Sequence, residues 1–293
     1  MFESAELGNA IDKATFKAEV PGLREALLNA QFDLAQSRRF PVIVILSGAD
    51  GSGKREVVHT LTEWMDPRHN QTHALAPSGE ERQRPQMWRF WRVLPPRGKI
   101  GVFFHSWYSA PVLSRALGET TDADLDQSLD DIARFEKMLT AEGALLLKIR
   151  LHISKKKQKQ RLRKLERNPQ TRWRVTQDEW KHYELYDEFT IYTQRAIRRT
   201  STPDAPWIIV EGTDERYRSL TIAKAILDGL RAGPPAKEAS RPVQATPVAT
   251  NVGGLHLLGA LDMSQRIEKP VYLERLEACQ GQLNLLSRHR KFG

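Results

Sequence analysis

Apolar runs without polar alternation recur along the first 230 residues of the chain. They occupy residues 40–48, 99–104, 145–153 and 207–210. Continuous β-branched and apolar runs are typical of strands that are covered on both faces in a parallel sheet. The segments between them have helical patterns. Strands that alternate with helices predict an α/β fold with a mainly parallel sheet.

Amphipathic patterns, with apolar residues three and four positions apart, predict the helices. The expected helices occupy residues 18–38, 122–143, 177–199 and 217–230, with a very basic helix after residue 154. In the first of them, Leu23, Leu27 and Leu34 share one face. Ser154 is a residue type that caps helix N-termini, so we expect the basic helix to begin directly after it.

The composition changes after residue 230. Residues 231–254 are rich in Pro, Ala, Gly, Ser and Thr without a periodic apolar face, which is typical of a flexible linker. Within 255–293, IEKPVY at 267–272 echoes IDKATF at 11–16, and both copies lead into a leucine-bearing helix and a basic cluster. We interpret this as a domain at 1–230 followed by the opening helical segment of a truncated second unit; chance likeness of short helices is the alternative.

Composition restricts the class of protein. The 293 residues are 40% hydrophobic and 28% charged, with a formal net charge of +9. The single cysteine, Cys279, excludes an internal disulfide and a cysteine-rich zinc site, and we expect it to be a small buried side chain. No apolar run approaches the roughly 20 residues of a membrane helix, and the acidic N-terminus is unlike a signal peptide. We expect a cytoplasmic protein that does not contact membranes.

A glycine-rich loop follows the first predicted strand. Residues 48–54, GADGSGK, fit the pattern G-x-x-x-x-G-K between a strand and a helix, where backbone N–H groups and Lys54 can hold phosphate. Arg55 replaces the usual hydroxyl residue, so Asp50 becomes the nearest hard oxygen ligand for Mg²⁺. The predicted phosphate-binding residues of the loop are Gly48, Gly51, Ser52, Gly53 and Lys54. The alternative is a glycine-rich turn with a solvated lysine.

Arginines and aromatic residues are interleaved upstream of the second predicted strand. They are Arg82, Arg84, Arg89, Arg92, Arg97, Trp88, Phe90 and Trp91. Arginine binds phosphate bidentately and aromatic rings can stack on a base, but for Phe90 and Trp91 we favour a place in the core. A phosphotransferase would carry an acidic metal ligand at the end of this strand. The chain has Phe104 and His105 there, which argues against full activity.

Positive charge is concentrated at residues 148–199, where there are 16 Lys and Arg residues and 6 Asp and Glu residues. Such a run is usually a solvated helix face. Beside a phosphate loop, basic helices at roughly 154–199 also suit a lid that closes over a polyanion. A nucleic-acid binder is a third interpretation, which rests on charge alone and which we do not favour.

Taken together, these residues resemble the polyphosphate kinase 2 family, specifically the first half of its tandem-domain members, the polyphosphate:AMP phosphotransferases. The similarity covers nearly all of residues 12–230. Beyond GADGSGK, it rests on SWY at 106–108, LHISKKKQKQR at 151–161, RW at 172–173, YDEFTIY at 186–192 and TSTPDAPWIIV at 200–210. The resemblance implies a P-loop kinase-like three-layer fold with a basic helical lid. It also implies Mg²⁺ as cofactor, inorganic polyphosphate and AMP or ADP as substrates, and a homo-oligomer.

The resemblance also implies roles for particular side chains. Asp50 matches the loop aspartate that the family uses with Mg²⁺ and the acceptor phosphate, Lys54 matches its phosphate-loop lysine, and Arg89 matches the arginine of its LWR-like segment. These three are the candidate catalytic residues. The candidate phosphate-binding residues of the lid are Arg161, Arg163 and Arg172. The family's Asp-Arg pair at the strand end is replaced here by Phe104 and His105.

Two hypotheses from different classes follow. The leading one is a polyphosphate-dependent nucleotide phosphotransferase, in which positioning and charge neutralisation promote an in-line transfer. The rival is a non-catalytic unit that binds polyphosphate or nucleotide and supports a catalytic second domain. The rival has weight because losing one metal-binding carboxylate removes transition-state stabilisation. The pattern does not distinguish AMP from ADP as acceptor, nor the direction of transfer.

Overall fold

A five-stranded parallel sheet lies at the centre of the chain's first unit. The computed structural model describes residues 1–75, 84–85, 87–169, 171–172, 175–235 and 266–287, and the chain divides into two units, Met1–Lys237 and Glu238–Gly293. The strands are β1 (Val42–Gly48), β2 (Asn70–Ala74), β3 (Ile100–His105), β4 (Leu145–His152) and β5 (Trp207–Glu211). Their order is β2-β3-β1-β4-β5, and each pairing is parallel. The predicted α/β class and the four predicted strands are confirmed.

β2 is the strand that the apolar pattern did not predict. Its sequence, NQTHA, is polar, and its side chains are half-buried or exposed. It lies at the edge of the sheet, where it pairs with β3 alone. An edge strand that is not covered on both faces does not need a continuous apolar run.

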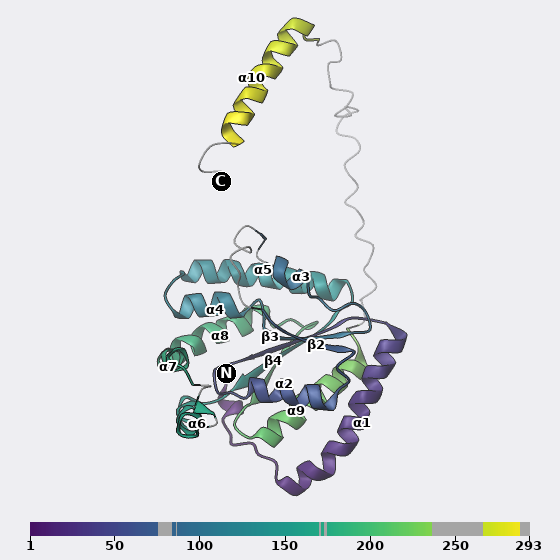
Figure 1. Cartoon of the computed structure of the whole chain (residues 1–293), viewed down its shortest axis with the longest axis vertical. Coiled ribbons are helices and arrows are strands. Elements are labelled where there is room, and N and C mark those ends of the chain that lie inside the picture. Colours follow the sequence, from purple (N-terminus) through teal and green to yellow (C-terminus); the bar gives the residue numbers. More distant parts are fainter. Residues whose placement is uncertain (76–83, 86, 170, 173–174, 236–265, 288–293) are drawn as a thin grey trace, which may run out of the picture. The chain divides into compact units, whose positions relative to one another are not determined.

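Helices cover both faces of the sheet and give the predicted three layers (Figure 1). One layer consists of α1 (Lys13–Ser37), α2 (Lys54–Trp64) and α9 (Glu215–Ala232). The other consists of α3 (Trp88–Trp91), α4 (Ser109–Ala116), α5 (Asp122–Ala141) and α8 (Tyr186–Thr200). The remaining elements of the first unit are η1 (Glu3–Ala5), α6 (Lys155–Arg167) and α7 (Gln177–Glu184). Because α6 begins just beyond the carboxyl end of β4, it lies at the edge of the sheet where ligands of such folds bind.

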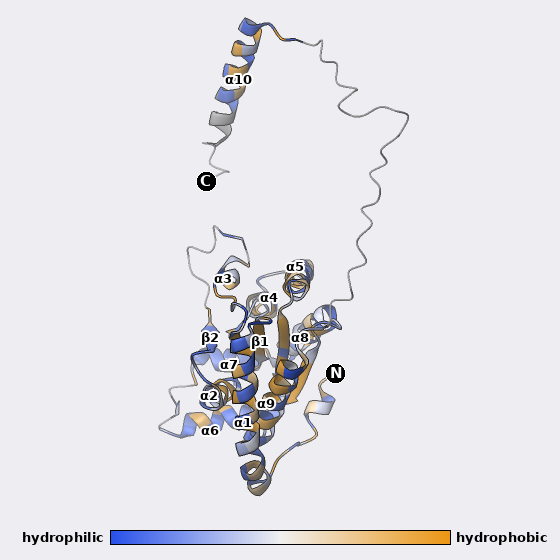
Figure 2. Cartoon of the chain, turned by 90° about the vertical axis from the view of Figure 1, so that its right-hand side faces the viewer, coloured by the Kyte–Doolittle hydropathy of each residue, from blue (hydrophilic) through white to orange (hydrophobic). Residues whose placement is uncertain are grey.

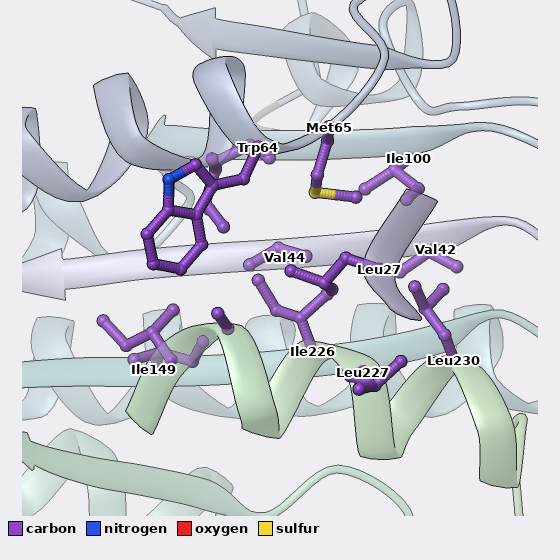
Figure 3. Close-up of a cluster of buried hydrophobic side chains, with 14 of the residues drawn as sticks. Leu27, Val42, Val44, Trp64, Met65, Ile100, Ile149, Ile226, Leu227 and Leu230 are labelled. Atoms are coloured by element: carbon purple, nitrogen blue, oxygen red, sulfur yellow. The ribbon is translucent and has the colours of Figure 1, made fainter. Parts of the chain in front are cut away.

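Alternate residues of each central strand enter two separate cores, because side chains alternate across a strand. Val42 and Val44 of β1 pack with Leu27 of α1 and Ile226 of α9 (Figure 3). Ile43, between them, enters the core beneath α5 and α8. The strands are accordingly hydrophobic at the centre of the unit (Figure 2).

The prediction of a single long helix at 177–199 is wrong, because the structure has two helices there, α7 and α8. Leu185, with φ −88° and ψ 20°, separates α7 from α8. The sequence has neither glycine nor proline at the break. The break turns α7 toward the phosphate loop, while the Tyr186 hydroxyl after it donates to the Ile153 carbonyl (2.9 Å). The predicted cap of the basic helix is present, since Ser154 Oγ accepts a hydrogen bond from the Lys157 N–H.

The second unit contains α10 (Lys269–Ser287), at the place where the echo of the N-terminal sequence predicted a helix. The expectation that Cys279 is buried is wrong, because the side chain is exposed on α10, whose described neighbours are also exposed. Most of the expected linker, residues 236–254, lies outside the described residues. No helix in the described part of the chain is long and apolar enough to cross a membrane.

Candidate active site

The phosphate loop joins the carboxyl end of β1 to the N-terminus of α2, as the motif predicted. Lys54 is the first residue of α2, and Gly53 before it has φ +98°, a conformation that favours glycine. A Cβ atom at Gly53 would lie 2.5 Å from Nε of Arg218. Backbone conformation and space therefore both require glycine at this position.

Two buried polar residues that do not line the pocket support the loop. Ser52 is fully buried and its N–H donates to the Ala49 carbonyl (3.1 Å), while Arg218, 1% exposed, donates from Nη1 to the Gly212 carbonyl (3.0 Å). A Cβ atom at Gly212 would lie 2.3 Å from the Ser52 carbonyl oxygen. Ser52, which the motif predicted as a phosphate contact, is therefore a buried residue that supports the loop and does not line the pocket.

A pocket of about 190 Å³ opens beside the loop, at the carboxyl ends of the strands. Its charged and polar side is lined by Asp50, Lys54, His105, Arg150, Gln158 and His182. Its apolar side is lined by Tyr108, Val112, Leu113, Phe189, Ala196, Ile197 and Trp207. Of the predicted loop contacts, Gly48, Asp50 and Lys54 line the pocket, while Gly51, Ser52 and Gly53 do not. The helices predicted as a lid, α6 to α8, all contribute residues to the lining.

Two side chains from these helices form hydrogen bonds to Asp50 of the loop. His182 of α7 lies with Nδ1 2.8 Å from Asp50 Oδ2, and Gln158 of α6 donates from Nε2 to the Asp50 carbonyl (2.9 Å). The hydrogen bond to Asp50 raises the pKa of His182. Burial alone would raise the pKa of Asp50, but the hydrogen bond from His182 and the charge of Lys54 outweigh it and lower that pKa. The pair is therefore an ion pair in mildly acidic solution.

This pair predicts a pH-dependent contribution to stability. A raised His182 pKa gives stability that is complete below 6.5 and is lost as pH rises through the raised value. A lowered Asp50 pKa gives stability that is complete above 3.8 and is lost as pH falls through the lowered value. We therefore expect His182→Ala to lower the melting temperature more at about pH 5 than at about pH 9. Both side chains are about a third exposed, so the contribution is at most about 1 kcal/mol.

Thermal unfolding of wild type and His182→Ala at the two pH values measures this difference. His59→Ala, which removes an exposed histidine from α2, is the matched control. An equal loss at both pH values in His182→Ala would contradict the ion pair.

Phe104 and His105, at the carboxyl end of β3, also line the pocket. Lys54 Nζ lies 5.3 Å from the centre of the Phe104 ring, within the range of a cation–π contact. Burial, and then the charge of Lys54, lower the pKa of His105, so its imidazole is neutral at pH 7. The end of β3 thus brings neither a carboxylate nor a permanent positive charge to the site.

The other predicted arginines lie outside the lining of this pocket. Arg161 of α6 approaches the loop but pairs with Glu56 (2.8 Å). Arg163 and Arg172 are exposed and do not line the pocket. Arg89 lies on α3 with its guanidinium 4.8 Å from the Phe90 ring centre, and Phe90 itself is 2% exposed within the core. The core interpretation of Phe90 is therefore confirmed, whereas Trp91 is 49% exposed.

Sequence reasoning missed Arg150, Gln158 and His182. Arg150 belongs to the run at 145–153, for which the sequence pattern predicts a strand covered on both faces by apolar side chains. Its second half alternates instead, because Lys148, Arg150 and His152 share one face of β4 and Ile149 and Leu151 share the other. That period of two is visible in the sequence KIRLH and is the signal that identifies these residues. Nothing comparable marks His182, whose place depends on the break at Leu185.

The pocket lining offers few protein ligands for a metal ion. Asp50 is the carboxylate among the lining residues, and no cluster of three or more His, Cys, Asp or Glu side chains suited to a metal occurs in the described part of the chain. Mg²⁺ in phosphate-transfer sites is usually held by one or two carboxylates, substrate phosphates and water. Asp50 therefore fits a magnesium–phosphate complex and not a metal ion held by protein groups alone.

Comparison with known proteins decides the family. Residues 10–238 match the family model "Polyphosphate kinase 2 (PPK2)". The chain belongs to the polyphosphate kinase 2 family. The resemblance drawn from the motifs is thus confirmed at the level of the family.

Curated members of the family match most or all of the chain. The polyphosphate:AMP phosphotransferase of Pseudomonas aeruginosa is 49% identical over 100% of the chain, which covers 59% of that protein. The polyphosphate:AMP phosphotransferase of Pseudomonas syringae pv. tomato is 42% identical over 97% of the chain, which covers 57% of it. The chain therefore spans somewhat under three fifths of the length of these curated relatives.

Solved structures of the family share the fold. A crystal structure from Pseudomonas aeruginosa PA01, assigned to polyphosphate kinase 2, has a TM-score of 0.82 and 45% identity, covering 100% of this chain and 57% of its own. Polyphosphate kinase 2 from Arthrobacter aurescens TC1 has a TM-score of 0.73 and 29% identity, covering 77% and 82%. The α/β fold with a parallel sheet, predicted from the apolar pattern, and the three layers, implied by the resemblance, are thus the fold of this family.

Proposed function

We propose that the first unit of this chain is a polyphosphate-dependent nucleotide phosphotransferase with AMP as acceptor. The observation that carries the proposal is that one pocket is lined both by the phosphate-loop lysine, Lys54, and by many apolar side chains. Inorganic polyphosphate has no apolar part, so the apolar lining suits the nucleoside of the acceptor. The names of the two Pseudomonas relatives support polyphosphate and AMP as the pair of substrates.

In the proposed reaction, a terminal P–O–P bond of polyphosphate breaks and a new P–O–P bond forms to the phosphate of AMP. The products are ADP and a polyphosphate shorter by one unit. The second pKa of a phosphate monoester is about 6, so the attacking oxygen is already deprotonated at neutral pH and no side chain has to act as a base. The protein contributes position and charge.

Lys54 and the N-terminus of α2 neutralise charge on the transferred phosphoryl group. Asp50 would hold Mg²⁺ together with substrate phosphates, and the bound ion would add positive charge at the phosphate oxygens. The exposed basic side chains of α6, among them Arg163, extend the positive surface beyond the pocket for the remaining polyanion. The homo-oligomer implied by the resemblance stays a prediction.

A comparison of acceptors tests the proposal. Long-chain polyphosphate, Mg²⁺ and either AMP or ADP are incubated with the protein, and the nucleotides are separated by chromatography. We expect ADP to form from AMP with a higher kcat/KM than ATP from ADP. Turnover of ADP alone would contradict AMP as the acceptor.

The non-catalytic alternative is favoured by one observation, the aromatic side chain of Phe104 beside Lys54. Phe104→Asp separates the two functions, because it places a second carboxylate next to the lysine and Asp50. If the remainder of the site is competent, we expect the rate of transfer to rise about tenfold or more. A metal-binding carboxylate lowers the activation barrier by more than about 1.4 kcal/mol. Steady-state transfer from polyphosphate to AMP measures it.

Phe104→Asn is the matched control, because it has the size of aspartate without the charge. A rise in Phe104→Asp but not in Phe104→Asn supports an enzyme whose rate is limited at this position. Absence of turnover in wild type and in both variants would favour the non-catalytic unit.

A further inference from the structure

Three buried basic side chains follow one another along one face of β4. They are Lys148, 0% exposed, Arg150, 8% exposed, and His152, 4% exposed. Two of them contact a carboxylate: Lys148 Nζ lies 2.7 Å from Glu136 Oε2, and His152 Nε2 lies 2.7 Å from Glu6 Oε1. Arg150, between them, forms no salt bridge within the described part of the chain. It is the member of the series that no carboxylate contacts among the described residues.

The guanidinium of Arg150 is buried but only partly satisfied. Its Nη1 donates to Ser47 Oγ (3.0 Å), whereas Nε has no hydrogen-bond partner among the described residues. Burial lowers its pKa to about 10, with the charge of Asp50 acting in the opposite direction, so the group is still cationic at neutral pH. A buried cation without a counter-ion is costly. An anionic ligand would remove that cost.

Arg150 lies close to the phosphate loop, where its charge can act on a ligand bound there. β4 and β3 flank β1 on opposite sides, and Arg150 is in register with Ser47, just before the loop begins. Arg150 lines the same pocket as Lys54 and Asp50, and its charge acts on Lys54 strongly enough to help lower that pKa after burial. On the β3 side, Phe104 and neutral His105 offer no permanent charge. Of the two strands beside β1, it is β4 that brings a positive charge to the pocket, through Arg150.

We propose that Arg150 is a phosphate-binding residue of this pocket, which holds one phosphate group jointly with Lys54. The inference deepens the proposed function and rests on it. The phosphate belongs to the acceptor nucleotide or to the end of the polyphosphate chain, and both present the same oxygens to the guanidinium. Arginine suits the position because its fork of donors can keep Ser47 and bind the anion at the same time.

Binding and stability measured together test the role. Arg150→Gln removes the charge and keeps a donor for Ser47, Arg150→Lys keeps the charge, and Arg134→Gln removes an exposed arginine from α5 as the matched control. Calorimetric titration with AMP, and separately with inorganic polyphosphate, gives the affinities. Thermal unfolding without phosphate gives the stability.

We expect Arg150→Gln to weaken binding of the ligand that supplies the phosphate by about 10- to 100-fold, the range of a hydrogen bond to a charged group. The AMP and polyphosphate titrations identify which ligand that is. Arg150→Lys should retain part of the affinity and Arg134→Gln all of it. Without phosphate, Arg150→Gln should melt at or above the temperature of wild type, because a buried unpaired charge is gone.

Unchanged affinity of Arg150→Gln for both ligands would overturn the inference. A melting temperature below that of wild type would also overturn it, because Arg150 would then be a structural group. If Lys54→Met loses binding while Arg150→Gln does not, the role of Arg150 fails and the proposed function stands. If wild type binds neither ligand, the proposed function itself fails.

Discussion

Replacing Lys54 with Met is expected to reduce phosphoryl transfer from polyphosphate by about 10²- to 10³-fold, the effect of removing one preorganised donor at a developing charge. Lys54 begins α2, lines the pocket and lies beside the Phe104 ring. Burial lowers the pKa of Lys54, whereas the charge of Asp50 acts in the opposite direction. A charge that is partly removed from water interacts more strongly with an anion. The loss should appear in kcat, because the charge on the phosphoryl group changes most in the transition state.

The fold should tolerate this change. Methionine is close to lysine in length, and a thioether packs well against an aromatic ring. Arg55→Met is the matched control, since it removes the same charge from the next, exposed position of α2. A loss of transfer in Arg55→Met as large as that in Lys54→Met would mean that general positive charge, and not the lysine in the loop, is responsible.

Glu136→Leu is expected to destabilise the first unit by about 3–5 kcal/mol, the range for breaking a buried ion pair from one side. Glu136, on α5, is 4% exposed. Its Oε2 accepts from Lys148 Nζ (2.7 Å), and its Oε1 accepts from Trp107 Nε1 (2.9 Å) and the Tyr108 hydroxyl (2.6 Å). Leucine would remove the shared acceptor of three buried donors, and Lys148, the charged one, would keep only the Thr200 carbonyl (2.6 Å). Burial lowers the pKa of Lys148, and the charge and hydrogen bond of Glu136 act against that shift, so the carboxylate favours the charged lysine.

Urea unfolding of wild type, Glu136→Leu and Glu142→Leu measures the effect. Glu142 is an exposed glutamate just after α5, so its replacement should change stability by less than about 0.5 kcal/mol. Adding Lys148→Met to Glu136→Leu should restore much of the loss, because the second change removes the stranded charge. A single variant Glu136→Leu as stable as the control would contradict a structural role for this network.

The same network links the fold to the site. Tyr108 donates to Glu136 and lines the apolar side of the pocket, so the SWY motif positions a pocket wall through a buried carboxylate. Loss of Glu136 should therefore disturb nucleotide binding as well as stability. The sequence marks Trp107 and Tyr108 only as aromatic residues after a strand and does not identify their acceptor, which lies on α5, 28 residues after Tyr108 in the chain.

The central strands and the phosphate loop could be predicted because their signals are local. A strand covered on both faces needs a continuous apolar run, and a loop that turns its N–H groups inward needs glycine at positions such as Gly53. β2 gave no such signal, because an edge strand with one neighbour tolerates the polar sequence NQTHA. The break at Leu185 gave none either, since no glycine or proline marks it.

The pocket depends on contacts between distant segments, which local patterns do not contain. His182 reaches Asp50 across 132 positions of the chain. Arg150 was hidden in a run interpreted as apolar, although the alternation of KIRLH carries the information. The arginines that charge counting favoured, Arg163 and Arg172, are exposed, because a charge run on a helix places most of its side chains in solvent.

Formation of ADP by this 293-residue chain, from AMP, long-chain polyphosphate and Mg²⁺, is the decisive measurement for phosphoryl transfer at the phosphate loop. Lys54→Met protein purified in the same way sets the background from contaminating kinases, and omission of polyphosphate sets the background from other donors. We expect ADP formation that requires polyphosphate and falls to background in Lys54→Met. ADP formation equal in the two proteins, or none in wild type while it still binds polyphosphate, would contradict a phosphoryl-transfer site at this loop.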